Sequence, residues 1–504
     1  MTCSLRTHLT QTFATALVLA VMAWAVSVEK SAAQHHHHAQ ATSSAEHHTH
    51  TPAASPLAET DTVAGHPVLE NISDEPGIVE VELTAAPERL ELKPGTETDV
   101  YAYNGRVPGP LLEVTEGDSV IIHFKNKLPH ETTVHWHGIH LPFVSDGSPF
   151  HPVEPGGTFT YAFKVKPGTA GTYWYHPHPH HHTAYQVGMG LYGGIIVRDP
   201  EDPLPEMTER LLILSDQRFN EDGSLSFAEE GTREFRVDEM NGREGDVLFV
   251  NDEVMPELSI RPGEVQRWRI VNASGARIYR LGLEGHTFKH VGTDGGLFEH
   301  PEEVDDIVLA NGERAELLVR GSGDAGSTAR LQALQYDRYM PQWRPSDWDE
   351  TLDLLTMLYT DESRVNPIEI PQTLRAMPEL DFEKATVTRR MSMTNGRING
   401  KTMDMERVDE VAELGAKEVW EVENLVGMDH PFHLHGFQFQ VIELNGEPVE
   451  QRRWEDTVNV PGFEKATFVV RLDNFPGKWM FHCHILDHED QGMMGVLEVK
   501  ENPE

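Results

Sequence analysis

Apolar and polar residues alternate along many short segments of this chain. Residues 158–165 and 437–442 are two clear examples. Successive side chains of a strand point to opposite faces of a sheet, so this period of two predicts half-buried β-strands. Turn residues separate the segments, and 41 Gly and 32 Pro among 504 residues favour a turn-rich β protein over a helical one. We therefore predict an all-β fold.

One combination of turns and strand occurs three times. In each copy an Asn lies ahead of a turn, an alternating strand follows and leads to a second Asn, and a Gly comes twelve or thirteen residues later. The three strands cover residues 119–125, 265–271 and 419–423. Turns and strands at this spacing predict three copies of one antiparallel β-sandwich. We place the copies at residues 71–200, 201–365 and 366–504.

The N-terminal segment is expected to lie outside this repeat. An apolar run over residues 12–28 follows a single Arg6, and small residues lead to Gln34, as in a secretory signal peptide over residues 1–34. The run is short for a membrane span, so cleavage is favoured over an uncleaved anchor, and no later segment is apolar enough to cross a membrane. We expect export to the periplasm or the medium. The His-rich residues 35–70 predict a disordered linker, either a metal-gathering arm or a neutral spacer.

The formal net charge is −40, from 41 Lys and Arg against 81 Asp and Glu. A charge of this sign argues against nucleic acid and against an anionic membrane surface as partners. It suits cationic substrates or metal ions, but a soluble, charged surface is the simpler interpretation. The expected state is a monomer.

The segment 482–493 concentrates groups that bind metal ions. It contains one thiol, three imidazoles and a thioether: Cys483, His482, His484, His488 and Met493. Cys483 is the only cysteine beyond Cys3 of the predicted leader, so no intramolecular disulfide is open to it. A Cys, two His and a weak Met form a blue-copper site. The partner histidine is expected from elsewhere in the chain, with His430 as the natural candidate.

Three histidine pairs precede that segment: His135 and His137, His176 and His178, and His433 and His435. With His482 and His484 they supply eight imidazoles. On a strand, alternate residues share a face, so both rings of a His-x-His pair point to the same side. Two such strands facing each other can hold several metal ions, and imidazole suits copper.

Taken together, these motifs resemble those of the multicopper oxidases, the family of laccases, bacterial cuprous oxidases and ascorbate oxidases. All four motifs occur in the family's order, and segments 171–178 and 186–193 resemble the bacterial three-domain members. The resemblance implies three cupredoxin domains and four copper ions, one of type 1, one of type 2 and two of type 3. The ligands that it implies are His430, Cys483, His488 and Met493 for type 1, His135 and His433 for type 2, and two type 3 sets, His137, His176 and His484, and His178, His435 and His482.

Aligning the three copies assigns the predicted ligands to copies one and three. In copy two, Gly282 and Glu284 stand in the places of the first histidine pair. Copy two is therefore expected to hold no copper of this kind. Pro177 of copy one takes the place of Cys483, which removes the thiolate there. The remaining histidines of copy two are expected to be structural: His286, His290 and His300.

The resemblance also implies roles for a thiol and two acids. Cys483 lies between His482 and His484, so the thiolate that receives electrons is covalently joined to ligands of both type 3 ions. Dioxygen is reduced to water by four electrons and four protons. Asp146, nine residues after His137, and Glu489, directly after His488, stand where bacterial members carry proton-delivering acids.

The reducing substrate is the least specified part of this prediction. We favour a laccase-like enzyme that oxidises phenols and aromatic amines with dioxygen as acceptor. A cuprous oxidase is the alternative, because thioethers bind Cu(I) and several methionines precede copy three. Such methionines are more often core residues: Met391, Met393, Met403 and Met405, with Met340 further upstream. A copper-binding or electron-carrier protein would leave the eight imidazoles unexplained, and a two-domain copper nitrite reductase is disfavoured.

Overall fold

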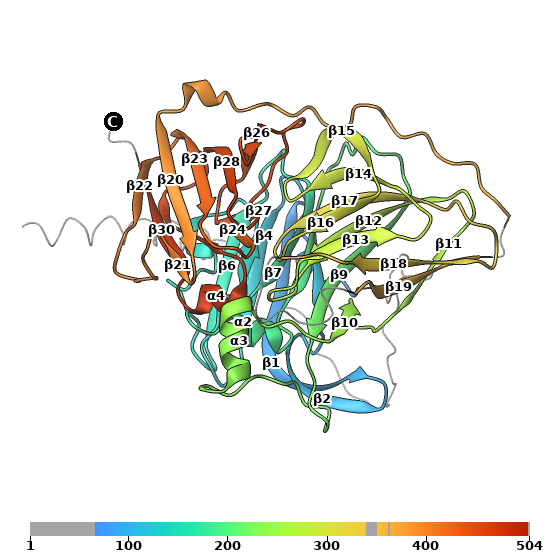
Figure 1. Ribbon diagram of the computed structural model, residues 1–504, viewed down its shortest axis with the longest axis horizontal. Coiled ribbons are helices and arrows are strands. Elements are labelled where there is room, and N and C mark those ends of the chain that lie inside the picture. Colours follow the sequence, from blue (N-terminus) through green and yellow to red (C-terminus); the bar gives the residue numbers. More distant parts are fainter. Residues whose placement is uncertain (1–65, 339–349, 361–362, 502–504) are drawn as a thin grey trace, which may run out of the picture. The chain divides into compact units, whose positions relative to one another are not determined.

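A computed structural model describes residues 66–338, 350–360 and 363–501 (Figure 1). The strands fall into three successive units. The first contains β1 (Ile78–Lys93), β2 (Thr96–Tyr103), β3 (Gly109–Thr115), β4 (Ser119–Asn126), β5 (His135–His137), the 3₁₀ turn η1 (Phe143–Ser145), β6 (Thr158–Lys164), β7 (Gly171–His176), α2 (Thr183–Gly188) and β8 (Gly193–Arg198).

The second unit begins at β9 and includes one longer helix. Its elements are β9 (Thr208–Gln217), α3 (Arg233–Asn241), β10 (Val247–Val250), β11 (Glu257–Ile260), β12 (Val265–Asn272), β13 (Tyr279–Leu283), β14 (Phe288–Thr293), β15 (Gly296–Val304), β16 (Asp306–Leu309), β17 (Arg314–Arg320), β18 (Thr328–Leu334) and β19 (Leu352–Tyr359).

The third unit carries the C-terminal strands. Its elements are η3 (Phe382–Lys384), β20 (Val387–Thr394), β21 (Arg397–Ile398), β22 (Glu410–Glu413), β23 (Lys417–Asn424), β24 (His430–Leu434), β25 (Phe439–Leu444), β26 (Glu447–Pro448), β27 (Thr457–Val460), β28 (Lys465–Arg471), β29 (Gly477–Cys483), α4 (Leu486–Asp490) and β30 (Met494–Lys500).

Each unit is built from two sheets with related strand orders. The orders are β2-β1-β4-β6 and β3-β8-β7-β5, then β10-β9-β12-β17-β14-β15 and β11-β19-β18-β13-β16, then β21-β20-β23-β28-β25-β26 and β22-β30-β29-β24-β27. Antiparallel pairing predominates, as predicted. Each sheet also holds one parallel pair, such as β1 with β4, β9 with β12 and β20 with β23, which alternation along one strand does not disclose.

The predicted repeat is present in the backbone. Asn104, Asn251 and Asn399 all adopt positive φ angles, of 49°, 63° and 52°. Asparagine tolerates this left-handed region because its short side chain bonds locally. In each copy its Oδ1 accepts from a backbone N–H of the neighbouring strand, at 2.7, 2.9 and 2.8 Å. The same turn therefore starts each copy.

The asparagines that end the repeated strands are also equivalent. Asn126, Asn272 and Asn424 are buried. Each donates through Nδ2 to two or more backbone carbonyls and accepts a backbone N–H two residues later. Because buried polar groups need partners, this residue joins the end of one strand to a following loop. The three predicted strands are confirmed as β4, β12 and β23, and the two alternating segments as β6 and β25.

Each unit has its own buried core. Trp136, Trp268 and Trp420 are fully buried in the first, second and third cores, respectively. Burying a large apolar side chain contributes about 1.5–3 kcal/mol. The all-β fold of three cupredoxin-like sandwiches is thus confirmed. The limits at 71–200, 201–365 and 366–504 stay predictions.

The predicted signal peptide, residues 1–34, and most of the His-rich linker lie outside the described residues. Residues 66–70 of that linker are ordered, because Leu69 is buried and its N–H donates to Leu111 of β3 at 2.8 Å. Ordered structure thus begins before residue 71. Within the described ranges, no helix is both long and apolar enough to span a membrane.

Candidate metal centre

Cys483, at the end of β29, lies beside two imidazoles. The ligand atoms of His430, Cys483 and His488 all lie within 4.8 Å of one another, and all three residues are buried. Sγ of Cys483 is 3.7 Å from Nδ1 of His488. Burial raises the pKa of the Cys483 thiol to about 12. A thiolate at neutral pH therefore requires a cation in this pocket.

The two neighbouring methionines face different surroundings. Met493 packs in the same buried cluster as Cys483, whereas Met494 packs with Met480 and Val496 in a separate cluster. The backbone of Met493 bonds to both candidate ligands, since its N–H donates to the His488 carbonyl at 2.9 Å and its carbonyl accepts from Cys483 N–H at 3.1 Å. Met493 is thus the thioether on the Cys483 side.

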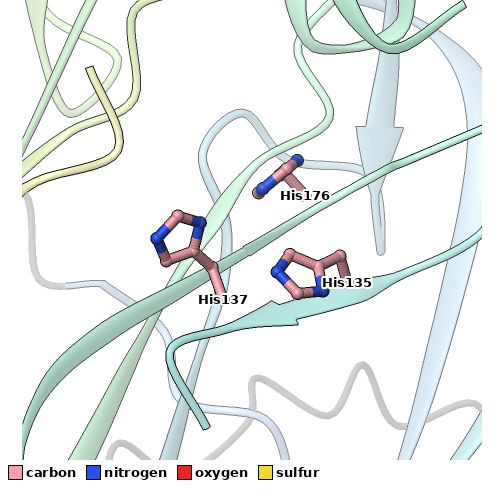
Figure 2. A group of neighbouring side chains, drawn as sticks. All are labelled: His135, His137 and His176. Atoms are coloured by element: carbon pink, nitrogen blue, oxygen red, sulfur yellow. The ribbon is translucent and has the colours of Figure 1, made fainter. Parts of the chain in front are cut away.

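Four strand segments bring the eight imidazoles together. In the first unit, His135 of β5 pairs with His176 of β7 (Figure 2). In the third unit, His433 of β24 pairs with His482 of β29 in the same register. All eight imidazole residues are buried. The predicted convergence of copies one and three is therefore observed.

Rings from the two units stack on each other across this junction. The His135 and His435 ring centroids are 3.9 Å apart, and those of His137 and His433 are also 3.9 Å apart. The rings of His178, His435 and His482 converge through Nε2 of His482, which lies 3.3 Å from Nε2 of His178 and 3.0 Å from Nε2 of His435. Facing imidazole lone pairs repel each other unless a cation or a proton lies between them, so this convergence fits a metal ion.

Most rings of the cluster have one nitrogen held by protein. Nδ1 of His135, His176 and His433 bonds to a backbone carbonyl at 2.8–2.9 Å, and Nε2 of each is buried without a hydrogen-bond partner. Fixing one ring nitrogen sets the tautomer and leaves the other as a donor to metal.

The protonation state of the cluster also fits metal binding. Burial, followed by the neighbouring imidazoles, lowers the pKa of six rings well below its ordinary value: those of His137, His176, His178, His435, His482 and His484. These rings are neutral at neutral pH and keep a free lone pair, which is the form that binds metal ions.

Comparison with protein families agrees with this geometry. Three family models, each described as multicopper oxidase, match residues 84–202, 202–327 and 375–503. The chain belongs to the multicopper oxidases. The resemblance predicted from the histidine motifs is confirmed, and the protein is an oxidoreductase of a copper-using family. Its buried imidazoles and thiol fit copper, which favours these ligands.

Relatives of this multicopper oxidase match along most of their length. It is 32% identical over 443 residues to the multicopper oxidase mco of Staphylococcus haemolyticus, covering 86% of this chain and 91% of the relative. A solved multicopper oxidase from Campylobacter jejuni, described as a metallo-oxidase, is 34% identical with a TM-score of 0.80, covering 89% and 97%. A solved laccase from Pediococcus acidilactici is 31% identical with a TM-score of 0.77, covering 86% and 93%.

Both predicted acids lie against the imidazole cluster of the multicopper oxidase. Oδ2 of Asp146 is 2.9 Å from Nδ1 of His435. The oxygens of Glu489 lie 3.3 Å from Nδ1 of His178 and 3.4 Å from Nδ1 of His482. Burial, followed by Asp490, raises the pKa of Glu489 well above its usual value. A carboxyl so placed holds a proton beside two rings of the cluster.

The histidines of the second unit bond elsewhere. Each donates to a backbone carbonyl: His286 to that of Glu284, His290 to that of Gly292 and His300 to that of Gln372. The other ring nitrogen of His286 bonds to the Tyr359 hydroxyl. Within the described ranges, none belongs to a group with metal-binding geometry. Their structural character stays a prediction.

Sequence reasoning missed one acid of the site, Asp456. Its Oδ1 lies 2.9 Å from Nε2 of His137, and its carbonyl accepts from Nδ1 of His433 at 2.9 Å. Asp456 follows His435 by 21 residues, whereas Asp146 follows His137 by nine, so the copies do not align there. Local sequence carries no signal for it beyond an acid ahead of β27.

Proposed function

We propose that this multicopper oxidase is laccase-like and couples one-electron oxidation of phenols or aromatic amines to the four-electron reduction of dioxygen to water. The observation that carries the proposal is the position of Cys483. Its side chain lies with His430 and His488, while the residues on either side of it, His482 and His484, belong to the imidazole cluster. The same strand therefore connects the Cys483 site, which would accept electrons from the donor, to the imidazole cluster, which would bind dioxygen.

The ligand sets proposed for the sites are those that the family resemblance implies, and two of them, His430 with Cys483 and His488, and His178 with His435 and His482, have ligand atoms within 4.8 Å of one another. His430, Cys483, His488 and Met493 would hold one type 1 copper, and His135 and His433 one type 2 copper. Two type 3 coppers would be held by His137, His176 and His484, and by His178, His435 and His482. When bound, these ions supply one-electron acceptance at the donor side and electron storage for dioxygen reduction.

The chain itself supplies the connection and the protons. Only peptide bonds separate Cys483 from His482 and His484, so the route between the sites needs no through-space contact. Asp146 and Glu489 contact different rings, His435 for the first and His178 and His482 for the second. We propose that both acids hold protons for dioxygen, because a carboxyl near the reacting group acts as a general acid.

A cavity of about 320 Å³, lined in part by Asp487, the residue before His488, supports an aromatic donor. It lies between α2, α3 and α4, and its lining includes Tyr185, Phe227 and Phe235. Aromatic side chains pack well against a ring-shaped substrate. The His488 ring itself is covered, because its Nε2 bonds to the Met240 carbonyl of α3 at 3.1 Å. A donor in the cavity would therefore transfer its electron across this contact or through Asp487, next in the chain.

The cavity also carries four acids and one arginine: Asp238, Glu239, Asp487, Asp490 and Arg243. Asp238 pairs with Arg218 at 3.0 Å, and burial raises the pKa of Asp490 to about 8, so Glu239 is the acid that most favours a positively charged donor. An aromatic amine that bears an ammonium group matches this combination of rings and acids better than a neutral phenol does.

A cuprous oxidase remains the second candidate, because these acids also suit a metal ion and the Campylobacter relative is described as a metallo-oxidase. The methionine group gives it less support. Met391 and Met393 are buried in the core of the third unit, and Met403 packs against the cluster of Met480 and Met494. Met340 lies outside the described residues.

Export, a monomeric state and dioxygen as acceptor are part of the proposal. A secreted or periplasmic location rests on the apolar N-terminal run. A non-enzymatic copper carrier would need only the Cys483 site and would leave the second cluster without a role.

Steady-state rates with an aromatic amine, a phenol and Cu(I), measured on the same copper-loaded preparation, test the proposal. We expect the aromatic amine to be oxidised with the highest kcat/KM. Glu239→Gln should raise KM for an aromatic amine that bears an ammonium group and leave KM for a neutral phenol unchanged. Glu234→Gln, on the same helix but outside the cavity, is the matched control. Oxidation of Cu(I) alone would refute the laccase-like reading of the site, and no oxidation of any donor would refute the enzyme.

A further inference from the structure

His137 is held from outside the imidazole cluster by an acid of the other ligand-bearing unit. Its Nε2 lies 2.9 Å from Oδ1 of Asp456 and 3.3 Å from Oγ1 of Thr457. Its Nδ1 points the other way and lies 3.3 Å from Nε2 of His484. An ionised carboxylate only accepts hydrogen bonds, so Nε2 must carry the proton and Nδ1 the free lone pair. Asp456 thereby selects the nitrogen that faces the cluster.

Asp456 and Asp146 occupy mirrored places around the cluster. The backbone carbonyl of Asp146 accepts a hydrogen bond from His135. Its carboxylate accepts one from His435 of the third unit. The carbonyl of Asp456 accepts from His433 and its carboxylate from His137 of the first unit. Each acid thus holds one ring of its own unit through the backbone and one ring of the opposite unit through its side chain.

The two acids differ in what holds them. Arg314 donates to both oxygens of the Asp456 carboxylate, from Nη1 to Oδ1 at 2.8 Å and from Nη2 to Oδ2. Asp294 fixes the same group, because its carboxylate accepts the backbone N–H of Asp456 at 3.2 Å, of Thr457 at 3.1 Å and of Arg314 at 2.8 Å. Among the described residues, the carboxylate of Asp146 is paired with imidazoles and with no Arg or Lys. An arginine thus fixes the carboxylate of Asp456, whereas imidazoles alone contact that of Asp146.

Arg314 and Asp294 both come from the second unit, which carries none of the proposed ligands. Arg314 begins β17, and Asp294 follows β14. Both are buried, and Arg314 makes further bonds to the carbonyls of Gly312 and Thr172. A bidentate guanidinium–carboxylate pair has fixed geometry. The ligand-free unit therefore contributes a rigid support to the junction of the other two.

Gly138 leaves the space that this support needs. It has a φ of +84°, and a Cβ there would lie 2.5 Å from Oδ2 of Asp456 and 2.6 Å from Nη2 of Arg314. Both distances are below van der Waals contact. The glycine of the His-Trp-His-Gly motif is thus required by the Asp456–Arg314 pair as well as by the turn.

We propose that Asp456 is a positioning residue of the imidazole cluster, where it holds His137 with Nδ1 turned toward the metal. Arg314 and Asp294 of the second, ligand-free unit keep Asp456 in place. The proposal rests on the proposed function, because it takes the imidazole cluster to be a copper site. Hydrogen-bond partners on the outer nitrogen of a metal-binding histidine typically change metal affinity 10–100-fold when they are lost.

The test compares copper retention in Asp456→Asn, Arg314→Lys and wild type. In Asp456→Asn the amide oxygen is drawn to Arg314 and the amide N–H₂ faces Nε2 of His137, which favours the wrong tautomer. Arg314→Lys keeps the positive charge but loses the bidentate pair of hydrogen bonds to the Asp456 carboxylate. The matched control is Arg389→Lys, since Arg389 forms a similarly bidentate, largely buried pair with Glu418, distant in sequence from every proposed ligand.

Full-length, copper-loaded proteins are dialysed against EDTA, and the copper retained per chain, the blue absorption and the melting temperature are followed. We expect both test variants to lose copper from the imidazole cluster at 10–100-fold lower EDTA than wild type, with the blue absorption unchanged. Arg389→Lys should lower the melting temperature alone. Retention equal to wild type in both variants would overturn the proposal, as would a parallel loss of cluster copper and blue absorption that follows melting temperature across all three variants. A wild type that never binds copper at the cluster would instead overturn the proposed function.

Discussion

Replacing Cys483 with serine should stop donor oxidation and leave the fold in place. The thiol is fully buried in the core of the third unit and makes no disulfide. Its Sγ lies 3.7 Å from Nδ1 of His488, which is beyond the reach of a hydroxyl hydrogen bond. Serine would therefore remove a soft ligand without building a replacement contact, since a hard oxygen binds copper less well than a thiolate.

The cost to stability follows from the same geometry. A buried hydroxyl without a partner costs about 1–3 kcal/mol. At roughly 2–4 °C per kcal/mol for a unit of this size, the metal-free protein should melt about 2–12 °C lower than wild type. The eight imidazoles are not altered, so the cluster should still bind copper. Activity and stability are thus predicted to separate: nearly complete loss of turnover with a modest fall in melting temperature.

The assay measures copper content, blue absorption and donor oxidation on the copper-loaded form of each protein, and melting temperature on its metal-free form. Met494→Leu is a suitable control, because Met494 is equally buried but packs in the cluster of Met480, away from Cys483. We expect the control to stay blue and active. If Cys483→Ser retained turnover near that of wild type, entry of electrons through Cys483 would be wrong. If the variant failed to fold, the stability argument would be wrong.

Three further predictions concern protons, the N-terminal tract and acid stability. Asp146→Asn and Glu489→Gln, with full copper content, should slow reoxidation by dioxygen about 10²–10⁴-fold and leave reduction by donor unchanged, which stopped-flow kinetics would measure; equal reoxidation rates would exclude both acids. Deleting residues 35–50 should leave oxidation of aromatic donors by copper-saturated enzyme intact, because the tract precedes the first unit. Burial alone would raise the pKa of Glu209, but Arg269 and its neighbours outweigh burial and lower it to about 2 from 4.5. Its ionised form therefore stabilises the fold above pH 4.5, and this stabilisation is lost as pH falls toward 2. Glu209→Gln should lower the free energy of unfolding by at most about 3 kcal/mol at neutral pH and by little near pH 2, which chemical denaturation at the two pH values would measure.

The spacing of the histidine motifs was enough to predict which imidazoles and which thiol come together at the candidate site. His-x-His on a strand fixes which rings share a face, and the three copies show which unit lacks them. The alternation of residues 158–165 and 437–442 likewise predicted strands that the structure contains as β6 and β25. These features depend on local spacing, which a single sequence records.

Contacts between distant segments were out of reach of that reasoning. Asp456 and Arg314 are 142 residues apart, and their pairing depends on how the second and third units pack. The covering of His488 by the Met240 carbonyl joins residues 248 apart for the same reason. The parallel strand pairs also depend on long crossovers, which alternation within a strand does not encode.

The most direct test of the central claim is the number and kind of coppers bound by the full-length protein. Purified, copper-loaded enzyme should contain about four coppers per chain, show the blue absorption of a thiolate–copper bond and give one type 2 signal by electron paramagnetic resonance. Fully loaded protein without blue absorption would contradict the site proposed at Cys483. A stoichiometry of one copper per chain would contradict the cluster of eight imidazoles as a metal centre.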